Sequence, residues 1–317
     1  MSARWVAGCV RARALARRRI GAAAARDLAA SPDLDTAVQA LRASPYGARL
    51  PARPTLAHAE RGLADTLLWH ARVLAGWLPT DGVVALRLLA GWFEIANIDE
   101  HVHLLGREPG TPAPAPFALG ALATAWPRLA ATTSPGDLRT ALRGSAWGDL
   151  GDNGHDIHLT ACLTWAVRVA AGVAPAAAWA RGGAAVLVAR EVYLAGRRLP
   201  AVAVPLADRL FGPGWASAGD LTDFIARVHR DACWPLRTVT TPGDLWRAET
   251  AWWARVQADG TALLTGSGFG PQPPIGAVAV LAADAWRVRA ALESAARGGR
   301  GADLTGHGAT GVADALA

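Results

Sequence analysis

Apolar residues recur at helical spacing along most of the chain, in segments separated by proline- and glycine-rich breaks at 109–116, 199–205 and 266–274. Alanine supplies much of the apolar content and favours helix over strand. The β-branched and aromatic runs that strands need are scarce. We therefore expect an all-α fold, followed by a flexible glycine-rich tail over 300–317.

One motif occurs twice. The segment ALRASPYG at 40–47 reappears as ALRGSAWG at 141–148, which is 141 − 40 = 101 residues later. Each copy follows a serine-proline pair, at Ser31 and at Ser134, where serine can cap a helix and proline can take its first position. A similar start at Ser217 opens a third, more diverged copy. The sequence therefore predicts an internal repeat.

The repeated units also share an ending, an apolar helix followed by glycine and a basic residue. These closing helices are expected over 86–107, 184–198 and 275–297. The resulting division has three diverged helical units and the tail, at 1–108, 117–200, 206–299 and 300–317.

The closing helix over 86–107 is apolar nearly all round, which is typical of a buried helix. Its polar residues, Arg87, Glu94, Asn97 and His101, share one stripe and must find partners inside the protein. One interpretation is a polar seam that fixes helix register, which we favour because no nucleophile accompanies the stripe. The alternative is a helical enzyme with this seam as its site. In the third unit, Asp284 and Arg287 are three residues apart and are expected to pair.

Other candidate chemistry is weak. Two clusters contain metal-ligand residue types, but neither has a known ligand spacing. They are Asp99, Glu100, His101 and His103, and Asp152, His155, Asp156 and His158. The loop Gly266–Gly270 resembles a phosphate-binding loop but lacks the lysine, so a linker is expected. No motif for a serine or cysteine nucleophile is present. We therefore assign no catalytic, cofactor-binding or metal-binding residue, and expect no cofactor.

Composition adds a rival hypothesis. All 32 basic residues of this 317-residue chain are arginine, the net charge is +6, and one dense basic cluster lies within residues 11–19. An arginine-rich nucleic-acid-binding adaptor is thus an alternative. However, no nucleic-acid-binding motif is present, and we expect no nucleic acid as a partner. Three separated cysteines, Cys9, Cys162 and Cys233, indicate neither a metal site nor a disulfide framework and suit a cytoplasmic setting.

Two further expectations concern surfaces. Trp246, Trp252 and Trp253 lie on one predicted helix and are interpreted as core residues, with an aromatic contact surface as the alternative. The apolar runs at 186–189 and 275–283 are shorter than the roughly 20 residues that cross a bilayer, so no membrane span is expected.

Several of these motifs together resemble a known family. The turn Ser44-Pro45-Tyr46-Gly47, the helix Glu94-Ile95-Ala96-Asn97-Ile98 and the last helix from Asp284 to Leu292 are similar to the V0D/AC39 family of V-type (A/V-type) ATPase components. This family has prokaryotic and eukaryotic members. The resemblance spans roughly residues 4 to 299. The second and third units depart from it, because neither has asparagine in the slot of Asn97.

The resemblance implies three helical units arranged as a pseudo-threefold funnel on the membrane proteolipid ring, with the rotor shaft in its socket. The implied role is non-catalytic: a central-stalk adaptor that couples shaft and ring for ion transport, with protons as the expected ion. Its place would be the cytoplasmic face of the membrane, as a peripheral protein. The direction of the machine and the contact residues are left open by the sequence.

Overall fold

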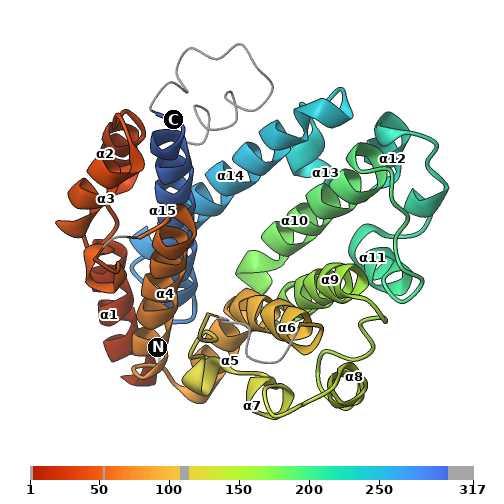
Figure 1. The fold of residues 1–317 in the computed structure, drawn as a ribbon, viewed down its shortest axis with the longest axis horizontal. Coiled ribbons are helices and arrows are strands. Elements are labelled where there is room, and N and C mark those ends of the chain that lie inside the picture. The colour runs from red at the N-terminus through yellow and green to blue at the C-terminus, as the bar shows by residue number, and fades with distance from the viewer. Residues whose placement is uncertain (1–2, 53, 108–113, 299–317) are drawn as a thin grey trace. The chain divides into compact units, whose positions relative to one another are not determined.

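The computed structural model describes residues 3–52, 54–107 and 114–298, and the described part is all-α, with no strand (Figure 1). The all-α prediction is therefore confirmed. The predicted tail over 300–317 lies outside the described residues. None of the described helices is both long and apolar enough to cross a bilayer.

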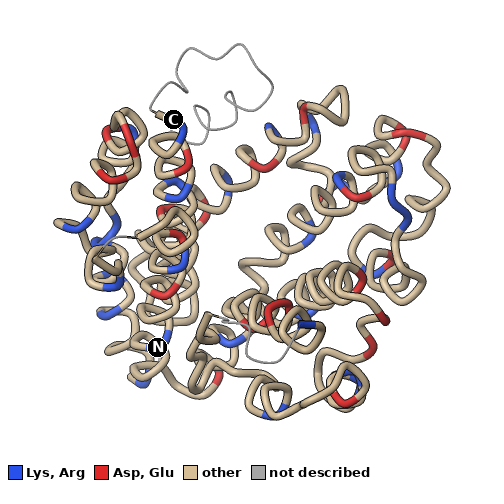
Figure 2. Tube along the Cα trace, viewed as in Figure 1, with Lys and Arg blue, Asp and Glu red and all other residues tan. Residues whose placement is uncertain are grey.

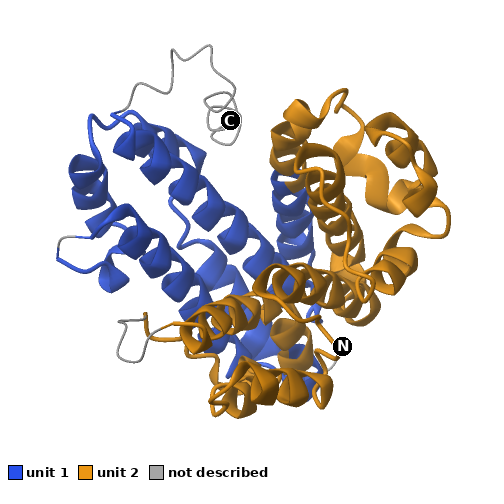
Figure 3. Ribbon diagram, turned by 45° about the vertical axis from the view of Figure 1, so that its right-hand side comes forward, with its two compact units in different colours: residues 1–82, 253–317 blue, residues 83–252 orange. Residues whose placement is uncertain are grey.

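Packing divides the chain into two compact units (Figure 3). Unit 1 comprises residues 1–82 and 253–317, and unit 2 comprises residues 83–252. Unit 1 joins the two ends of the sequence because the last long helix packs on the first helices. These units follow spatial packing and not the repeat, so the sequence-based division at 1–108, 117–200 and 206–299 stays a prediction.

In unit 1, the last long helix packs against four helices from the start of the chain. It is α15, Gln272–Ala296, and its partners are α1 (Val6–Ala16), α2 (Gly21–Ala29), α3 (Leu34–Arg42) and α4 (Leu56–Ala75). Short 3-10 turns lie at η1 (Ala3–Trp5) and η2 (Gly47–Arg49). Two helices cross the unit boundary, α5 (Thr80–Leu89) and α14 (Leu245–Thr265).

In unit 2, α9 (Gly154–Gly172) packs against α6 (Gly91–Leu105), α10 (Ala177–Ala189) and α11 (Val204–Phe211). Smaller helices surround these: α7 (Trp126–Leu129), α8 (Pro135–Arg143), α12 (Leu221–Arg227) and α13 (Arg230–Cys233). The 3-10 turns are η3 (Gly120–Leu122), η4 (Ala174–Ala176), η6 (Trp215–Ser217), η7 (Trp234–Leu236) and η8 (Pro242–Asp244), and η5 (Arg190–Leu194) is a π-helix.

The helix predicted over 86–107 is interrupted. α5 ends at Leu89 and α6 begins at Gly91, so Arg87 lies on a different helix from Glu94. Trp165 explains the break, because its indole Nε1 donates to Leu88 O at 2.6 Å, a carbonyl that a continuous helix would use internally. A Cβ at Gly91 would lie 2.7 Å from Trp165 Cδ1, so this indole also requires a glycine there.

The helix that runs into each copy of the repeated motif is capped at the same repeat position. Asp33 caps α3 by accepting from Thr36 N, and Ser134 caps α8 by accepting from Asp137 N. These caps are 134 − 33 = 101 residues apart, the offset of the motif itself. The prediction that Ser31 is the first cap was wrong. Asp33 takes this role, and the Ser31 N–H donates to Leu28 O at the end of α2. Aspartate takes the role equally well, since its carboxylate also accepts from a first-turn N–H.

The third predicted start shows the same substitution. Asp220, not Ser217, caps α12 by accepting from Asp223 N, while the Ser217 hydroxyl donates to Gly214 O.

Within unit 1, α14 and α15 approach closely at two glycines. A Cβ on Gly276 would lie 2.6 Å from Gly260 O, and one on Gly260 would lie 2.8 Å from Ala279 Cβ. Neither neighbouring atom is the end of a flexible side chain, so a larger residue at either position forces the helices apart.

We predict that Gly276→Ala lowers the free energy of unfolding by about 1–3 kcal/mol, the cost of overpacking. The measurement is urea denaturation followed by circular dichroism. Gly136→Ala in α8 is the matched control, because a Cβ there meets no atom closer than 3.8 Å, and a change within about 0.5 kcal/mol is expected. Equal losses in the two variants would contradict the close approach.

Candidate functional site

The most conspicuous buried polar groups are two fully buried carboxylates, Glu94 on α6 and Asp284 on α15, each with 0% exposed surface. Removing a carboxylate from water is costly unless several hydrogen-bond donors surround it. Each of these carboxylates has three donors.

In unit 1, Asp284 caps the start of α2. Its Oδ2 accepts from Ile20 N at 2.9 Å and its Oδ1 from Gly21 N at 2.8 Å. The third donor is the Tyr46 hydroxyl, 2.9 Å from Oδ2. Burial and the Asp284 carboxylate raise the pKa of Tyr46 well above its ordinary value, so the hydroxyl stays a donor. We call Asp284, Ile20, Gly21 and Tyr46 the first carboxylate joint.

In unit 2, Glu94 makes the same kind of arrangement at the start of α7. Its Oε2 accepts from Thr124 N at 2.6 Å and its Oε1 from Ala125 N at 2.7 Å. The Trp147 indole Nε1 donates to Oε1 at 2.8 Å. We call Glu94, Thr124, Ala125 and Trp147 the second carboxylate joint.

The aromatic donors of both joints come from the repeated motif. Tyr46 and Trp147 occupy the same motif position, and each is held by the same serine turn. Ser44 Oγ donates to Leu41 O and accepts from Tyr46 N, while Ser145 Oγ donates to Leu142 O and accepts from Trp147 N. The repeat thus delivers an aromatic N–H or O–H to a buried acid.

The third copy lacks this joint. Tyr46 and Trp147 each lie 13 residues after their helix cap (46 − 33 and 147 − 134), and the residue 13 after Asp220 is Cys233. Its thiol contacts Arg230 O, and the corresponding acid, Glu191, binds His155 Nε2 and Arg197 Nε, at 2.7 and 2.5 Å. These partners lower the pKa of Glu191, with the Arg197 hydrogen bond as the largest cause.

The remaining residues of the polar stripe bind one neighbouring segment of unit 2. Arg87 donates twice to Ala121 O, and Asn97 exchanges two hydrogen bonds with the main chain of Phe117, at 3.0 and 2.7 Å. His101 Nε2 lies 2.9 Å from Thr132 Oγ1, and burial lowers the pKa of this histidine. With Glu94, all four stripe residues hold segment 117–132.

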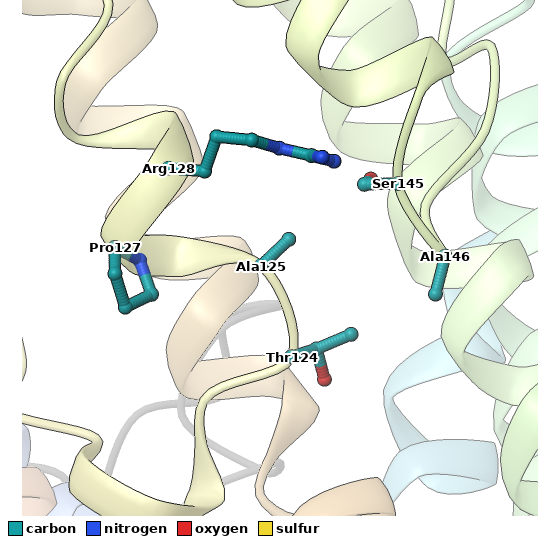
Figure 4. A pocket seen from close by; sticks show the side chains of 6 residues that line it. All are labelled: Thr124, Ala125, Pro127, Arg128, Ser145 and Ala146. Atoms are coloured by element: carbon teal, nitrogen blue, oxygen red, sulfur yellow. The ribbon is translucent and has the colours of Figure 1, made fainter.

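The surface beside the second joint is an open hollow. It is lined by Thr124, Ala125, Pro127, Arg128, Ser145 and Ala146 (Figure 4). Arg128 donates to Ala141 O and Gly144 O, so its guanidinium is bound to the main chain next to the serine turn. The lining includes no acid and no histidine.

The two clusters of metal-ligand residue types, which the sequence did not favour as metal sites, are dispersed. Asp152 pairs with Arg139, Asp156 with Asn153, and His155 with Glu191. His103 Nδ1 lies against the main-chain oxygen of Asp99, at 2.7 Å, while the Asp99 side chain pairs with His158. Among the residues that the structure describes, no group of three or more such side chains is placed to hold a metal ion.

Loop 266–270 presents acceptors. Arg13 donates to Leu264 O, Gly266 O and Gly268 O, and Cys9 Sγ donates to Gly270 O. A phosphate loop needs N–H donors turned toward its ligand. These carbonyls have the opposite polarity, so the contacts of this loop do not favour phosphate binding.

Two other predicted features have definite contacts. Asp284 and Arg287 were expected to pair. Their side chains form no direct ion pair, because the joint uses the Asp284 carboxylate and Arg287 donates to Gln257 Oε1, but the charge of Asp284 still acts on the guanidinium. In the tryptophan group, all half-buried, Trp252 Nε1 donates to Trp179 O and Trp253 stacks on Trp286.

No family model and no curated protein matches this sequence.

Two arginines of the N-terminal cluster, together with Arg49, act on the buried His70. Burial, followed by the charges of Arg18, Arg49 and Arg11, lowers the pKa of His70 to about 4, against an ordinary 6.5. At pH values between about 4 and 6.5, the unfolded chain therefore binds a proton at this histidine that the folded chain does not bind. His70 thus removes stability as the pH falls from 6.5 toward 4.

We predict that wild-type protein loses about 2 kcal/mol of unfolding free energy through His70 between pH 7.5 and pH 5. In His70→Gln this part of the pH dependence is expected to disappear, as measured by urea denaturation at the two pH values. The exposed His229→Gln is the control and should keep the wild-type dependence. An unchanged slope in His70→Gln would refute the assignment.

We also predict that Glu94→Gln costs about 2–4 kcal/mol of unfolding free energy, because the new amide N–H₂ must face at least one buried donor. Thermal and urea denaturation measure the loss. Glu100→Gln is a control on the same helix, where a 3.9 Å pair with Arg107 on the surface should contribute less than about 1 kcal/mol. Asp284→Asn should behave as Glu94→Gln does, and a loss no larger than that of the control would sink the joint assignment.

Proposed function

We propose that this chain is the non-catalytic central-stalk adaptor of a rotary V-type ATPase, coupling the rotor shaft to the membrane proteolipid ring for ion transport. The observation that carries the proposal is the carboxylate joint. The residues that resemble the family, the turn around Tyr46, the helix around Glu94 and the last helix around Asp284, are those from which the two joints are built.

A part that transmits torque has to resist bending where its helices meet. A carboxylate with three donors in a buried site gives a stiff, directional contact, because breaking any one hydrogen bond leaves a buried polar group unsatisfied. The joints tie long helices to the short helices and turns of the repeat. This mechanical character supports a coupling role.

The enzyme alternative has less support. All three bonds at Glu94 go to the chain itself, and Arg87 and Asn97 are held by main-chain atoms. These groups are therefore engaged within the protein and are poorly placed to meet a substrate. The proposal accordingly assigns no catalytic residue to the polar stripe.

The nucleic-acid alternative is also less well supported. Figure 2 shows acidic residues interspersed with the arginines along the helices of both units. Several arginines pair with acids, such as Arg289 with Glu60 and Glu293, and Arg13 of the basic cluster binds loop carbonyls. The charge is thus partly used inside the protein, and the proposed location is the cytoplasmic face of the ring.

We predict that the tagged chain, co-expressed with the rotor-shaft and proteolipid components, captures both in a pull-down in mild detergent. The complex should survive nuclease treatment and 0.5 M salt, under which binding through nucleic acid falls steeply. Glu100→Gln serves as a folded control that keeps capture. Failure to capture either component would refute the adaptor proposal, and capture of nucleic acid alone would favour the rival.

A further inference from the structure

Three side chains of unit 2 stand in the order carboxylate, imidazole and thiol. His158 and Cys162 are four residues apart on α9, and Asp99 comes from α6. Asp99 Oδ2 lies 2.7 Å from His158 Nδ1, and His158 Nε2 lies 3.7 Å from Cys162 Sγ. Neither carboxylate joint uses these residues.

The imidazole has its two nitrogens committed to different partners. Asp99 fixes the ring from the Nδ1 side, which leaves Nε2 directed at the sulfur. The hydrogen bond to Asp99 is the largest cause that raises the pKa of His158 to about 10. At neutral pH, the sulfur therefore has a positively charged imidazolium 3.7 Å away, and this charge can stabilise negative charge on sulfur during a reaction.

The site is open to solvent. The side chain of His158 is 47% exposed and that of Asp99 25%, while Cys162 is half-buried. The other two cysteines differ. Cys9 is buried and donates to Gly270 O. Cys233 is half-buried like Cys162, but its thiol lies against Arg230 O, a main-chain oxygen, and not against an imidazole. Exposure alone therefore does not distinguish Cys162 from Cys233, whereas the histidine does.

The position of Cys162 within its helix favours thiol–disulfide exchange over acyl transfer. It lies in the middle of α9, where backbone N–H groups serve the hydrogen bonds of the helix. Acyl transfer needs N–H donors directed at a developing oxyanion, and a helix interior does not offer them. Thiol–disulfide exchange needs only a thiolate and access for the disulfide, because the leaving group departs as a thiolate.

We propose that Cys162 is a site of reversible S-thiolation by small disulfides, activated by His158 and Asp99. The Cys162 thiolate attacks one sulfur of the disulfide, and the bond between the two reagent sulfurs breaks. A mixed disulfide forms on Cys162. The other half leaves as a thiolate and equilibrates with protons from the solvent, while His158 stays protonated. The Cys162 sulfur is oxidised and the departing sulfur is reduced, so no further oxidant is needed.

The test is the rate of modification of the three cysteines in the full chain at pH 7. The reagent is 5,5′-dithiobis(2-nitrobenzoate), and peptide mass spectrometry after quenching with acid assigns each site. We expect Cys162 to react at least about tenfold faster than Cys233, with Cys9 protected. Oxidised glutathione, a biological disulfide, should show the same order.

His158→Gln is expected to bring Cys162 down to the rate of Cys233, and Asp99→Asn to slow it several-fold, with Cys233 unchanged in both. Cys9 reports the fold, because its modification would reveal opening of the protein. If Cys9 becomes reactive in His158→Gln, that variant is not folded, and the rate of Cys162 modification in Asp99→Asn decides the test. A Cys162 that reacts no faster than Cys233, or that keeps its rate in the folded variants, overturns the proposal.

Discussion

Burying a carboxylate is the constraint on which the rest of this structure depends. Glu94 and Asp284 are shielded completely from water, so each must be surrounded by donors with good geometry. The fold meets this demand in the same way twice. Two N–H groups at the start of a short helix meet the acid, and an aromatic side chain from a serine-stabilised turn supplies the third donor.

This constraint also explains the shape of the repeat. A closing helix is not completed by its own unit of sequence. α6 receives its donors from the segment that follows it, whereas α15 receives them from the beginning of the chain. The acid of the second copy, Glu191, has diverged to side-chain partners and lies in a π-helix, so only two of the three closing helices keep the full joint among the described residues.

Much of this could be predicted from the sequence. Alanine-rich helical spacing indicated the all-α fold, and the offset of 101 residues correctly related the two serine turns. The stripe through Glu94 and Asn97 had to find internal partners, and it does. Periodicity could not identify those partners, because they are main-chain groups brought close by tertiary packing. For the same reason, Asp284 was assigned to a neighbour on its own helix.

Other errors also arose from contacts between residues far apart in the sequence. Leu88 to Gly91 reads as helix, and the break depends on the Trp165 indole, 77 residues away. The sequence grouped His158 with other metal-ligand residue types and left Cys162 as an isolated cysteine. Asp99 joins these two residues only through the packing of α6 on α9. The sequence pattern therefore predicted most helices correctly but predicted few of the polar contacts between them.

The residues of the first joint are far apart in the sequence and are therefore synthesised at different times. Tyr46 and Asp284 are separated by 238 residues, so at roughly 5–20 residues per second the ribosome takes about 10–50 s to supply the acid after the tyrosine. During that interval, the helices at the start of the chain have no α15 to cover their apolar faces. Nascent unit 1 therefore cannot complete its core until α15 has been translated, whereas the second joint, with Glu94 and Trp147 only 53 residues apart, can form sooner.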